Sequence, residues 1–341
     1  MAEYNYAKHK QKKNIEDTIE MLKEMPDFVD YYFKSNSLSL SASSQHSYMY
    51  DIYNFLKWWH SSLPELSDTE LKDMSTDYVA KVTSADILDY IAYMRNESET
   101  FLSESTLARR CAALNNFFSY LEQFNIIELN PMTKVKRPKV KKDKRIIKLE
   151  DDEIERYFDS VLKGKGLTKH QKEYLKNTRL RDFTIVTLLL TSGIRVSEMV
   201  GLNIDDVSFQ NCRIQITRKG GKRQYIPLSD DTLNVLRDYI EERKKVSPAL
   251  TEDETALFLS TQNTRMTTAA VQNMIKKYAK AAGIDKPITP HKFRKTYGTN
   301  LYNKTRDIYL VANALGHDSV VTTTKHYVAT DEEDLMKVRN L

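Results

Sequence analysis

Apolar residues recur at helical spacing between residues 26 and 130 of this 341-residue chain. One stripe follows steps of four, three and four residues: Tyr48, Ile52, Phe55 and Trp59. Ser41 or Ser43 opens this helix. The same spacing predicts three more helices, one from Asp27, one from Ser84, and one from Ser103 or Ser105 that ends at Asn130-Pro131. Residues 26–130 are therefore expected to form an all-helical domain of about four helices.

Beyond residue 149 the pattern predicts helices around one small sheet. Helical stretches are expected at 151–162, 178–191, from Ser197, and at 230–245, 267–282, 290–302 and 308–315. Three stretches have the composition of strands: 207–209, 213–217 and 225–228. The last two flank a turn of sequence Lys-Gly-Gly-Lys at 219–222, which predicts a hairpin. We expect an α+β domain with a small antiparallel sheet, and a mainly α, two-domain chain.

A basic stretch separates the two predicted domains. Residues 134–148 hold nine lysines or arginines against one aspartate, and they show no apolar period until their end. We interpret 1–25 as a basic leader, 26–130 as the helical domain, 131–148 as a linker and 149–341 as the second domain. The linker charge suits a solvated surface, and it equally suits contact with the phosphates of a nucleic acid. The candidate DNA-binding residues are Lys136, Arg137, Lys139, Lys141, Lys142 and Lys222.

Composition describes a folded globular protein. Hydrophobic residues make up 40% of the chain and charged residues 29%, and the net charge of +5 matters mainly because the basic residues cluster. Cys111 and Cys212 each lie in an apolar segment, so we expect two buried free thiols and no disulfide. The N-terminus lacks the apolar core of a signal peptide, and the longest apolar run, at 185–190, is too short to span a bilayer. A cytoplasmic protein without membrane association is expected.

Six residues could carry chemistry, although each also has an ordinary structural explanation. His291 on a helix is more often structural, and Arg195 after a Ser-Gly turn suits a salt bridge. Lys219 suits a hairpin tip, His317 follows a glycine that caps a helix, and Tyr327 is one of 20 tyrosines.

The order of these residues is more specific than any member alone. Arg294 stands three residues after His291, so one ligand can lie within reach of both side chains on one helix face. Two arginines, a lysine, two histidines and a tyrosine are the groups that a phosphodiester exchange without a metal requires. The set comprises Arg195, Lys219, His291, Arg294, His317 and Tyr327.

From about residue 26 to its end, the chain resembles the tyrosine recombinases of the phage integrase family. The matching stretches are TSGIRVSEMVGL, TRKGGKRQYIPL, TPHKFRKTYGTNLY and LGHDSVVTTTKHY. MPDFVDYYFKSN and TRKGG make it most similar to the Xer branch, in particular to its streptococcal-type members that act without a partner paralogue. The resemblance implies a SAM-like core-binding domain followed by a catalytic domain.

The resemblance also implies a role for each matching residue. Arg195 and Arg294 correspond to the arginines that hold the non-bridging oxygens of the scissile phosphate. Lys219 corresponds to the hairpin lysine that protonates the leaving 5′ oxygen, with Lys222 as a competing candidate. Tyr327 corresponds to the nucleophile that forms a 3′-phosphotyrosyl bond, so neither ATP nor a metal nor another cofactor is implied.

The histidines and two departures complete this correspondence. His291 matches the residue that assists proton transfer at the tyrosine, and His317 the one that hydrogen-bonds a phosphate oxygen. Tyr327 stands ten residues after His317, whereas many members show nine, and the neighbouring His326 is a poor substitute because a phosphohistidine is foreign to this chemistry. Lys295 stands where Xer proteins often have histidine.

Two carboxylates near the matching motifs are interpreted as members of surface ion pairs. Asp182 and Glu198 resemble acidic positions that support the active site in relatives, but ion pairing at the surface explains them more simply. A metal-dependent nuclease is disfavoured because no carboxylate cluster occurs near the matching motifs.

The implied partner is double-stranded DNA with an inverted-repeat core site. The resemblance further implies a homotetramer on two such sites, strand exchange through a Holliday junction, passage of the 14 residues after Tyr327 to a neighbouring subunit, and room for accessory proteins. No additional arm-binding domain is visible, which favours Xer-type chromosome dimer resolution, linked to chromosome partition and cell division, or integration and excision of a mobile element. The alternatives are a catalytically silent DNA-binding regulator and a type IB topoisomerase-like activity.

Overall fold

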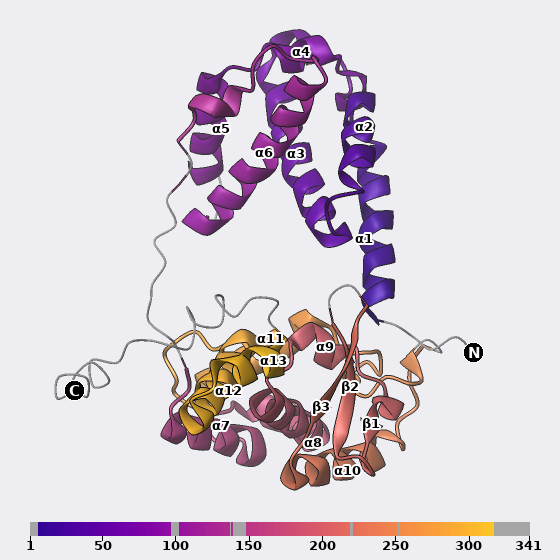
Figure 1. Ribbon diagram of the computed structural model, residues 1–341, viewed down its shortest axis with the longest axis vertical. Helices are drawn as coiled ribbons and strands as arrows, with labels where there is room; N and C mark the ends of the chain where they lie inside the picture. The colour runs from indigo at the N-terminus through magenta and orange to yellow at the C-terminus, as the bar shows by residue number, and fades with distance from the viewer. Residues whose placement is uncertain are drawn as a thin grey trace, which may run out of the picture. The chain divides into compact units, whose positions relative to one another are not determined.

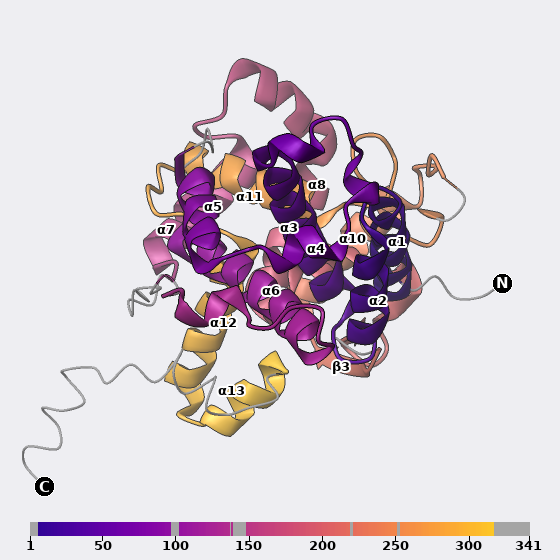
Figure 2. The same ribbon diagram turned by 90° about the horizontal axis from the view of Figure 1, so that it is seen from above.

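The chain folds into two compact units. The computed structural model describes residues 6–96, 102–136, 138, 148–218, 221–250 and 253–316. One unit covers Lys8–Asp143, and the other covers Met1–Ala7 together with Lys144–Leu341. Figure 1 and Figure 2 show the first as a group of helices and the second as helices with a small sheet at one side. The predicted fold class, mainly α with a small antiparallel sheet, is confirmed.

The helical unit consists of α-helices linked by short 3₁₀ turns. Its α-helices are α1 (Tyr6–Leu22), α2 (Asp27–Asn36), α3 (Ala42–Ser62), α4 (Thr76–Ala80), α5 (Ser84–Asn96) and α6 (Glu104–Gln123). The 3₁₀ turns are η1 (Pro64–Leu66), η2 (Leu71–Asp73) and η3 (Pro131–Lys134). Ser41 and Ser103 are the N-caps of α3 and α6, where their hydroxyls accept hydrogen bonds from backbone N–H groups three residues later.

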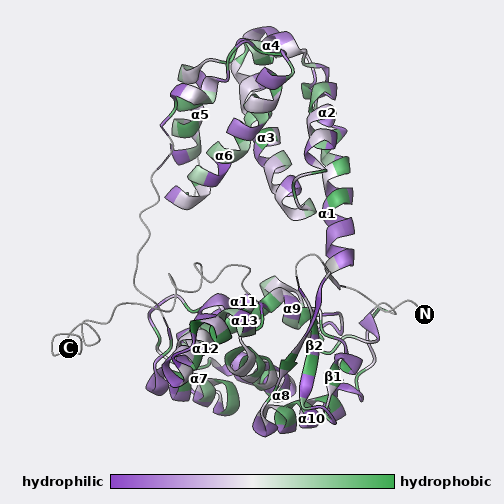
Figure 3. Cartoon of the chain, in the orientation of Figure 1, coloured by the Kyte–Doolittle hydropathy of each residue, from purple (hydrophilic) through white to green (hydrophobic). Residues whose placement is uncertain are grey.

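Two helices of this unit were not predicted. Helix α1 lies in the segment interpreted as a leader, and its first turns are coloured as hydrophilic in Figure 3. Its buried Thr18 lies 3.0 Å from His46 of α3, measured from the hydroxyl to Nδ1. Helix α4 is only five residues long. Both lack a clear apolar stripe, so their stability comes from packing that periodicity cannot report.

The predicted end of α6 at Asn130 is wrong. The helix ends at Gln123, because Asn125 adopts a left-handed φ of 56° and the N–H of Ile126 donates to the carbonyl of Leu121 at 2.9 Å. This is a Schellman motif in which asparagine replaces the usual glycine. Asn130 instead caps η3 by accepting a hydrogen bond from the Met132 N–H at 2.8 Å.

Aromatic residues fill the core of the helical unit. Ile52, Phe55 and Trp59 of the predicted stripe are buried, whereas Tyr48 is half-buried. The Phe55 ring meets Tyr90 and Phe118 edge to face, with centroids 5.2 and 5.5 Å apart. Such pairs contribute about 0.5–1.5 kcal/mol beyond the burial of their area.

The second unit combines helices with a three-stranded sheet. Its helices are α7 (Asp151–Lys163), α8 (Lys169–Ser192), α9 (Val196–Val200), η4 (Ile204–Asp206), α10 (Asp230–Arg243), α11 (Thr268–Ala281), α12 (Pro290–Thr305) and α13 (Ile308–Leu315). The strands β1 (Val207–Ser208), β2 (Arg213–Thr217) and β3 (Arg223–Pro227) pair antiparallel in that order. Thr217 pairs with Arg223, so the hairpin turn lies between these two residues. Figure 2 shows α13 folding back beside α12.

Helix α8 is the central helix of this unit. It starts nine residues before the predicted position because its first turns are polar and are fixed by a capping box between Thr168 and Gln171. Its apolar segment, including Ile185 and Leu189, is buried in the core. The helix ends at Ser192, and the C-cap residue Gly193, with a φ of 61°, turns the chain toward α9.

Replacing Gly193 with alanine is expected to lower the free energy of unfolding by about 2–5 kcal/mol. The substitution combines the strain of a left-handed backbone conformation with overpacking. A Cβ there would lie 2.3 Å from the Tyr297 ring. Gly221, with a φ of 81° and nothing within 4 Å of its Cβ position, is the matched control, and its alanine variant should lose only about 1–2 kcal/mol. Urea unfolding of both variants measures the difference, and equal losses would refute the clash.

The two cysteines differ in their exposure. Cys111 is buried as expected, but Cys212 is exposed, because it lies in the turn between β1 and β2 with a φ of 48°. Within the described ranges, no helix has the length and apolar character needed to cross a membrane.

Candidate active site

Three arginines converge on the C-terminal end of α13. Nη2 of Arg195 donates to the carbonyl of Gly316 at 3.3 Å, and Nη1 of Arg218 donates to that of Leu315 at 3.2 Å. Arg294 also donates to the Leu315 carbonyl. The last carbonyls of a helix lack partners within the helix and carry the negative end of its dipole, so guanidinium groups stabilise them. We call Arg195, Arg218 and Arg294 the arginine cluster.

Arg195 is fixed by Glu198 and remains partly exposed. It is the N-cap residue of α9, and its backbone N–H donates to Oε2 of Glu198 at 2.7 Å. Its Nη1 donates to Oε1 of the same carboxylate at 2.9 Å, while 41% of the side chain remains exposed. This arrangement fixes the direction of the guanidinium and leaves part of it open to a ligand.

Arg294 is the most deeply buried member of the cluster. Pro290 begins α12, and Arg294 lies one turn later with 3% of its surface exposed. Its Nη1 donates to the carbonyl of Gly193 at 2.6 Å, which links α12 to the turn before Arg195. His291 is exposed on the same helix, three residues earlier. The structure thus brings Arg195 and Arg294, which are far apart in sequence, to one helix end.

Arg218 was not among the predicted site residues. The backbone N–H of Arg218 donates to the carbonyl of Lys222 at 2.7 Å, across the hairpin. Nε donates to Oε1 of Gln224 at 2.8 Å. Only its position directly before Lys219 in the sequence pointed toward the site, and an arginine at a strand end is too common to be informative.

The preferred interpretation of Glu198 and Asp182 as surface ion pairs is wrong, because both carboxylates are buried. Only 4% of the Glu198 side chain is exposed, and both of its oxygens accept hydrogen bonds from Arg218 at 3.1 Å. Asp182 accepts hydrogen bonds from the Tyr278 hydroxyl at 2.7 Å and from Nη2 of Arg181 at 2.7 Å. Sequence spacing reports neither depth nor partners, so the burial could not be predicted.

The surroundings of Asp182 shift the pKa of its neighbours. Burial raises the pKa of Tyr278 well above its usual range, and the nearby carboxylate adds to the effect. Burial lowers the pKa of Lys277, although Nζ lies 3.7 Å from Asp182, whose charge opposes that shift. Asp182 therefore joins α8 to α11 through one buried polar network.

Replacing Asp182 with alanine is expected to destabilise the protein by about 3–5 kcal/mol, because it leaves buried cationic and hydroxyl partners without their carboxylate. Asp159, whose carboxylate pairs with the largely exposed Lys163 at 2.7 Å, is the control and should change stability by less than about 1 kcal/mol. Urea unfolding measures both, and a small loss at Asp182 would contradict a structural role for the network.

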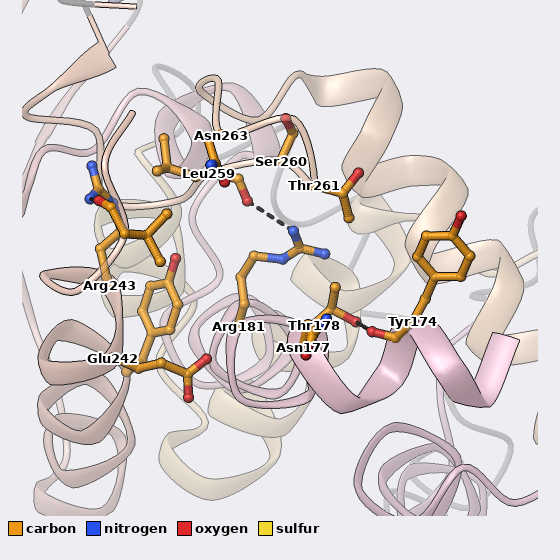
Figure 4. A pocket seen from close by; sticks show the side chains of 12 residues that line it. Tyr174, Asn177, Thr178, Arg181, Glu242, Arg243, Leu259, Ser260, Thr261 and Asn263 are labelled. Carbon is orange, nitrogen blue, oxygen red and sulfur yellow. Dashed lines mark hydrogen bonds between the residues drawn. The ribbon is translucent and has the colours of Figure 1, made fainter. Parts of the chain in front are cut away.

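A pocket of about 350 Å³ lies elsewhere in this unit and shares no residue with the arginine cluster. Figure 4 shows Arg181 reaching from α8 to the carbonyl of Leu259, to which it donates at 2.9 Å. Arg243, at the end of α10, donates to the carbonyls of Ala256 and Val246 at 3.0 Å. Both arginines thus hold backbone carbonyls of described residues between α10 and α11.

The other predicted site residues fall into two groups. Lys136 and Lys222 are described, and both are exposed. The remaining ones lie outside the described residues: Arg137, Lys139, Lys141, Lys142, Lys219, His317 and Tyr327. In the part of the chain that the structure covers, no group of three or more His, Cys, Asp or Glu side chains is placed to hold a metal ion.

Solved structures define the class to which this fold belongs. The chain superimposes on the XerH site-specific recombinase bound to a palindromic difH substrate in a post-cleavage complex, with a TM-score of 0.65, 17% identity, and coverage of 97% of this chain and 89% of that one. A lambda integrase dimer bound to a COC′ core site gives a TM-score of 0.60 at 17% identity, over 88% of this chain and 93% of that one. The fold is that of the site-specific recombinases.

Sequence comparison narrows the class to a family. The phage integrase family model matches residues 149–334. Tyrosine recombinase XerS of Streptococcus uberis is 30% identical over 91% of this chain and 94% of its own length. Tyrosine recombinase XerC of Caldanaerobacter subterraneus is 28% identical over 94% and 88%, respectively. The chain belongs to the phage integrase family and is a tyrosine recombinase enzyme, and the resemblance seen in the sequence is confirmed.

Proposed function

We propose that this recombinase cuts and rejoins double-stranded DNA at specific sites, with Tyr327 as the nucleophile. The observation that supports this most is the convergence of Arg195 and Arg294 on the end of α13. His317 follows this helix end directly in the sequence. Two guanidinium groups at one place suit a phosphate, whose non-bridging oxygens gain charge as the tyrosine attacks.

In the proposed reaction, the phenolic oxygen of Tyr327 attacks the scissile phosphorus and forms a 3′-phosphotyrosyl bond while the bond to the 5′ oxygen breaks. His291 assists removal of the phenolic proton, and Lys219 protonates the leaving 5′ oxygen, with the exposed Lys222 as the competing donor. His317 donates a hydrogen bond to a phosphate oxygen. The phosphodiester energy is conserved in the new bond, so the 5′ hydroxyl of another strand reverses the step without ATP.

Arg195 and Arg294 have different parts in this proposal. The partly exposed Arg195 meets the phosphate, and the Glu198 carboxylate fixes its direction. Arg294 donates to two backbone carbonyls and holds the turn that presents Arg195. Both stabilise the phosphate by preorganised charge and hydrogen bonding.

The proposed partner is a duplex with an inverted-repeat core site, bound by four copies of the chain that exchange C-terminal tails and pass through a Holliday junction. The linker lysines and arginines, with Lys136 as their described and exposed member, neutralise backbone phosphates. XerS and XerC relatives favour an Xer-type role in resolving chromosome dimers, in the cytoplasm and with accessory proteins, over integration of a mobile element.

The test is to incubate the purified protein, in EDTA, with nicked suicide substrates that carry candidate chromosomal and element junction sites. A covalent protein–DNA band on a denaturing gel is expected only with the correct site. The band should retain a 5′ label on the cleaved strand, because the protein takes the 3′ phosphate. Specific binding without a covalent product would support a DNA-binding regulator instead, and relaxation of plasmids without site preference would support a topoisomerase.

A further inference from the structure

Arg218 joins three elements of the second unit through one guanidinium group. Nη1 donates to both oxygens of Glu198 in α9 at 3.1 Å and to the carbonyl of Leu315 at 3.2 Å. Nη2 donates to the carbonyl of Ala314 at 3.3 Å, and Nε donates to Gln224 of β3 at 2.8 Å. The side chain is 8% exposed, so it is enclosed by the groups that it binds.

We propose that Arg218 is a positioning residue, which compensates the charge of Glu198 and so keeps Arg195 available for the scissile phosphate. This inference rests on the proposed function. Arg195, Arg218 and Arg294 bring three positive charges to the helix end, and Glu198 brings one negative charge. Two positive charges therefore remain for a phosphate. Without Arg218 only one would remain, and the buried carboxylate would face Arg195 as its one close cation among the contacts described above.

Glu198 also has a structural role at the start of α9. Its Oε2 accepts the backbone N–H of Arg195 at 2.7 Å and thereby fixes the start of α9. A carboxylate with a side chain only 4% exposed is weakly screened by water, so it interacts more strongly with Arg195 than a surface carboxylate does. Arg218 supplies the second cation that balances it.

The packing around Arg218 supports a fixed position for its guanidinium. A Cβ on Gly316 would lie 2.7 Å from Cζ of Arg218 and 2.8 Å from its Nε. Gly316 also has a φ of 59°, so the helix end and the guanidinium fit together only with glycine at this position. All three guanidinium nitrogens of Arg218 donate to groups of the protein, so we assign its effect on the phosphate to Arg195 rather than to direct contact.

The test compares four proteins: the wild type, Arg218→Gln, Glu198→Gln and the double variant. Glutamine at 218 keeps hydrogen-bond donors but removes the charge, and it is expected to slow single-turnover covalent-complex formation by about 10- to 100-fold, less than is typical for the loss of a group that touches the reacting atoms. Glutamine at 198 can still cap the start of α9. In the double variant the charges of Arg195 and Arg294 are again uncompensated, so the rate should recover at least about tenfold relative to Arg218→Gln.

This recovery separates charge compensation from a merely structural role. If Arg218 only held the fold together, a second substitution in the same network would leave the rate unchanged or lower it further, and that result would overturn the proposal. Thermal unfolding verifies that each variant is folded. Arg218→Lys, which keeps the charge without the fork-shaped group, should react at least about tenfold faster than Arg218→Gln. This pair decides the question if the double variant does not fold.

A second measurement distinguishes failure of this proposal from failure of the proposed function. The dissociation constant of each protein for the same DNA duplex is measured at fixed salt. If the wild type binds but never forms a covalent complex, the proposed function fails, and affinity then decides the Arg218 proposal. Weaker binding by Arg218→Gln with recovery in the double variant supports the proposal, and the same affinity in all four proteins overturns it.

Discussion

Replacing Tyr327 with phenylalanine is expected to abolish the covalent protein–DNA complex, a loss of at least about 10³-fold, because phenylalanine has no oxygen to attack the phosphate. Affinity for the DNA site should stay within about twofold of wild type, since most of the binding energy comes from contacts with the phosphate backbone. The measurement is the yield of covalent complex over time on a nicked suicide substrate, together with a gel-shift titration on the intact site.

Two variants serve as controls for this result. Tyr309, on α13, is 72% exposed, so Tyr309→Phe removes a tyrosine hydroxyl outside the proposed site and should leave the yield unchanged. His326→Ala removes the imidazole next to Tyr327 and should still form the complex. A persistent adduct in Tyr327→Phe, mapped by mass spectrometry to another residue, would show that the nucleophile has been misassigned.

The sequence predicted most helices of the fold because their local rules are strong. Strand β2 and helix α13 have the predicted bounds, and α3 and α6 begin after serine N-caps at predicted positions. Helices α1 and α4 escaped prediction because their stability depends on neighbours that periodicity does not reveal. The end of α6 depends on Asn125 adopting a left-handed conformation, which asparagine does only sometimes.

The site was likewise predicted only in part. The order of the motifs identified its residues, but it could not predict their burial. The motif order identified Arg195 and Arg294 as partners, and both do lie at the end of α13. Motif order could not show that Glu198 is enclosed between two arginines, nor that Arg218 is one of them. Burial and charge balance result from tertiary packing, which brings residues about 100 positions apart in sequence into contact.

The second large effect is expected at Arg294. Arg294→Ala should reduce the rate of covalent-complex formation by about 10²–10³-fold, because it removes a preorganised donor and releases the turn that holds Arg195. The substitution leaves the carbonyls of Gly193 and Leu315 without these hydrogen bonds, so a loss of stability of about 1–3 kcal/mol is expected as well. Single-turnover kinetics measure the first effect and urea unfolding the second.

Lys304→Ala is the matched control, since Lys304 is exposed on the same helix and should change neither quantity by more than about twofold or 0.5 kcal/mol. Arg294→Lys separates the two effects. Lysine keeps the charge, but its single ammonium does not reproduce two directed hydrogen bonds from a planar fork. A rate close to that of alanine would mean that geometry matters more than charge at this position, whereas a rate close to wild type would show that Arg294 acts as a charge alone and would contradict its part in holding the turn.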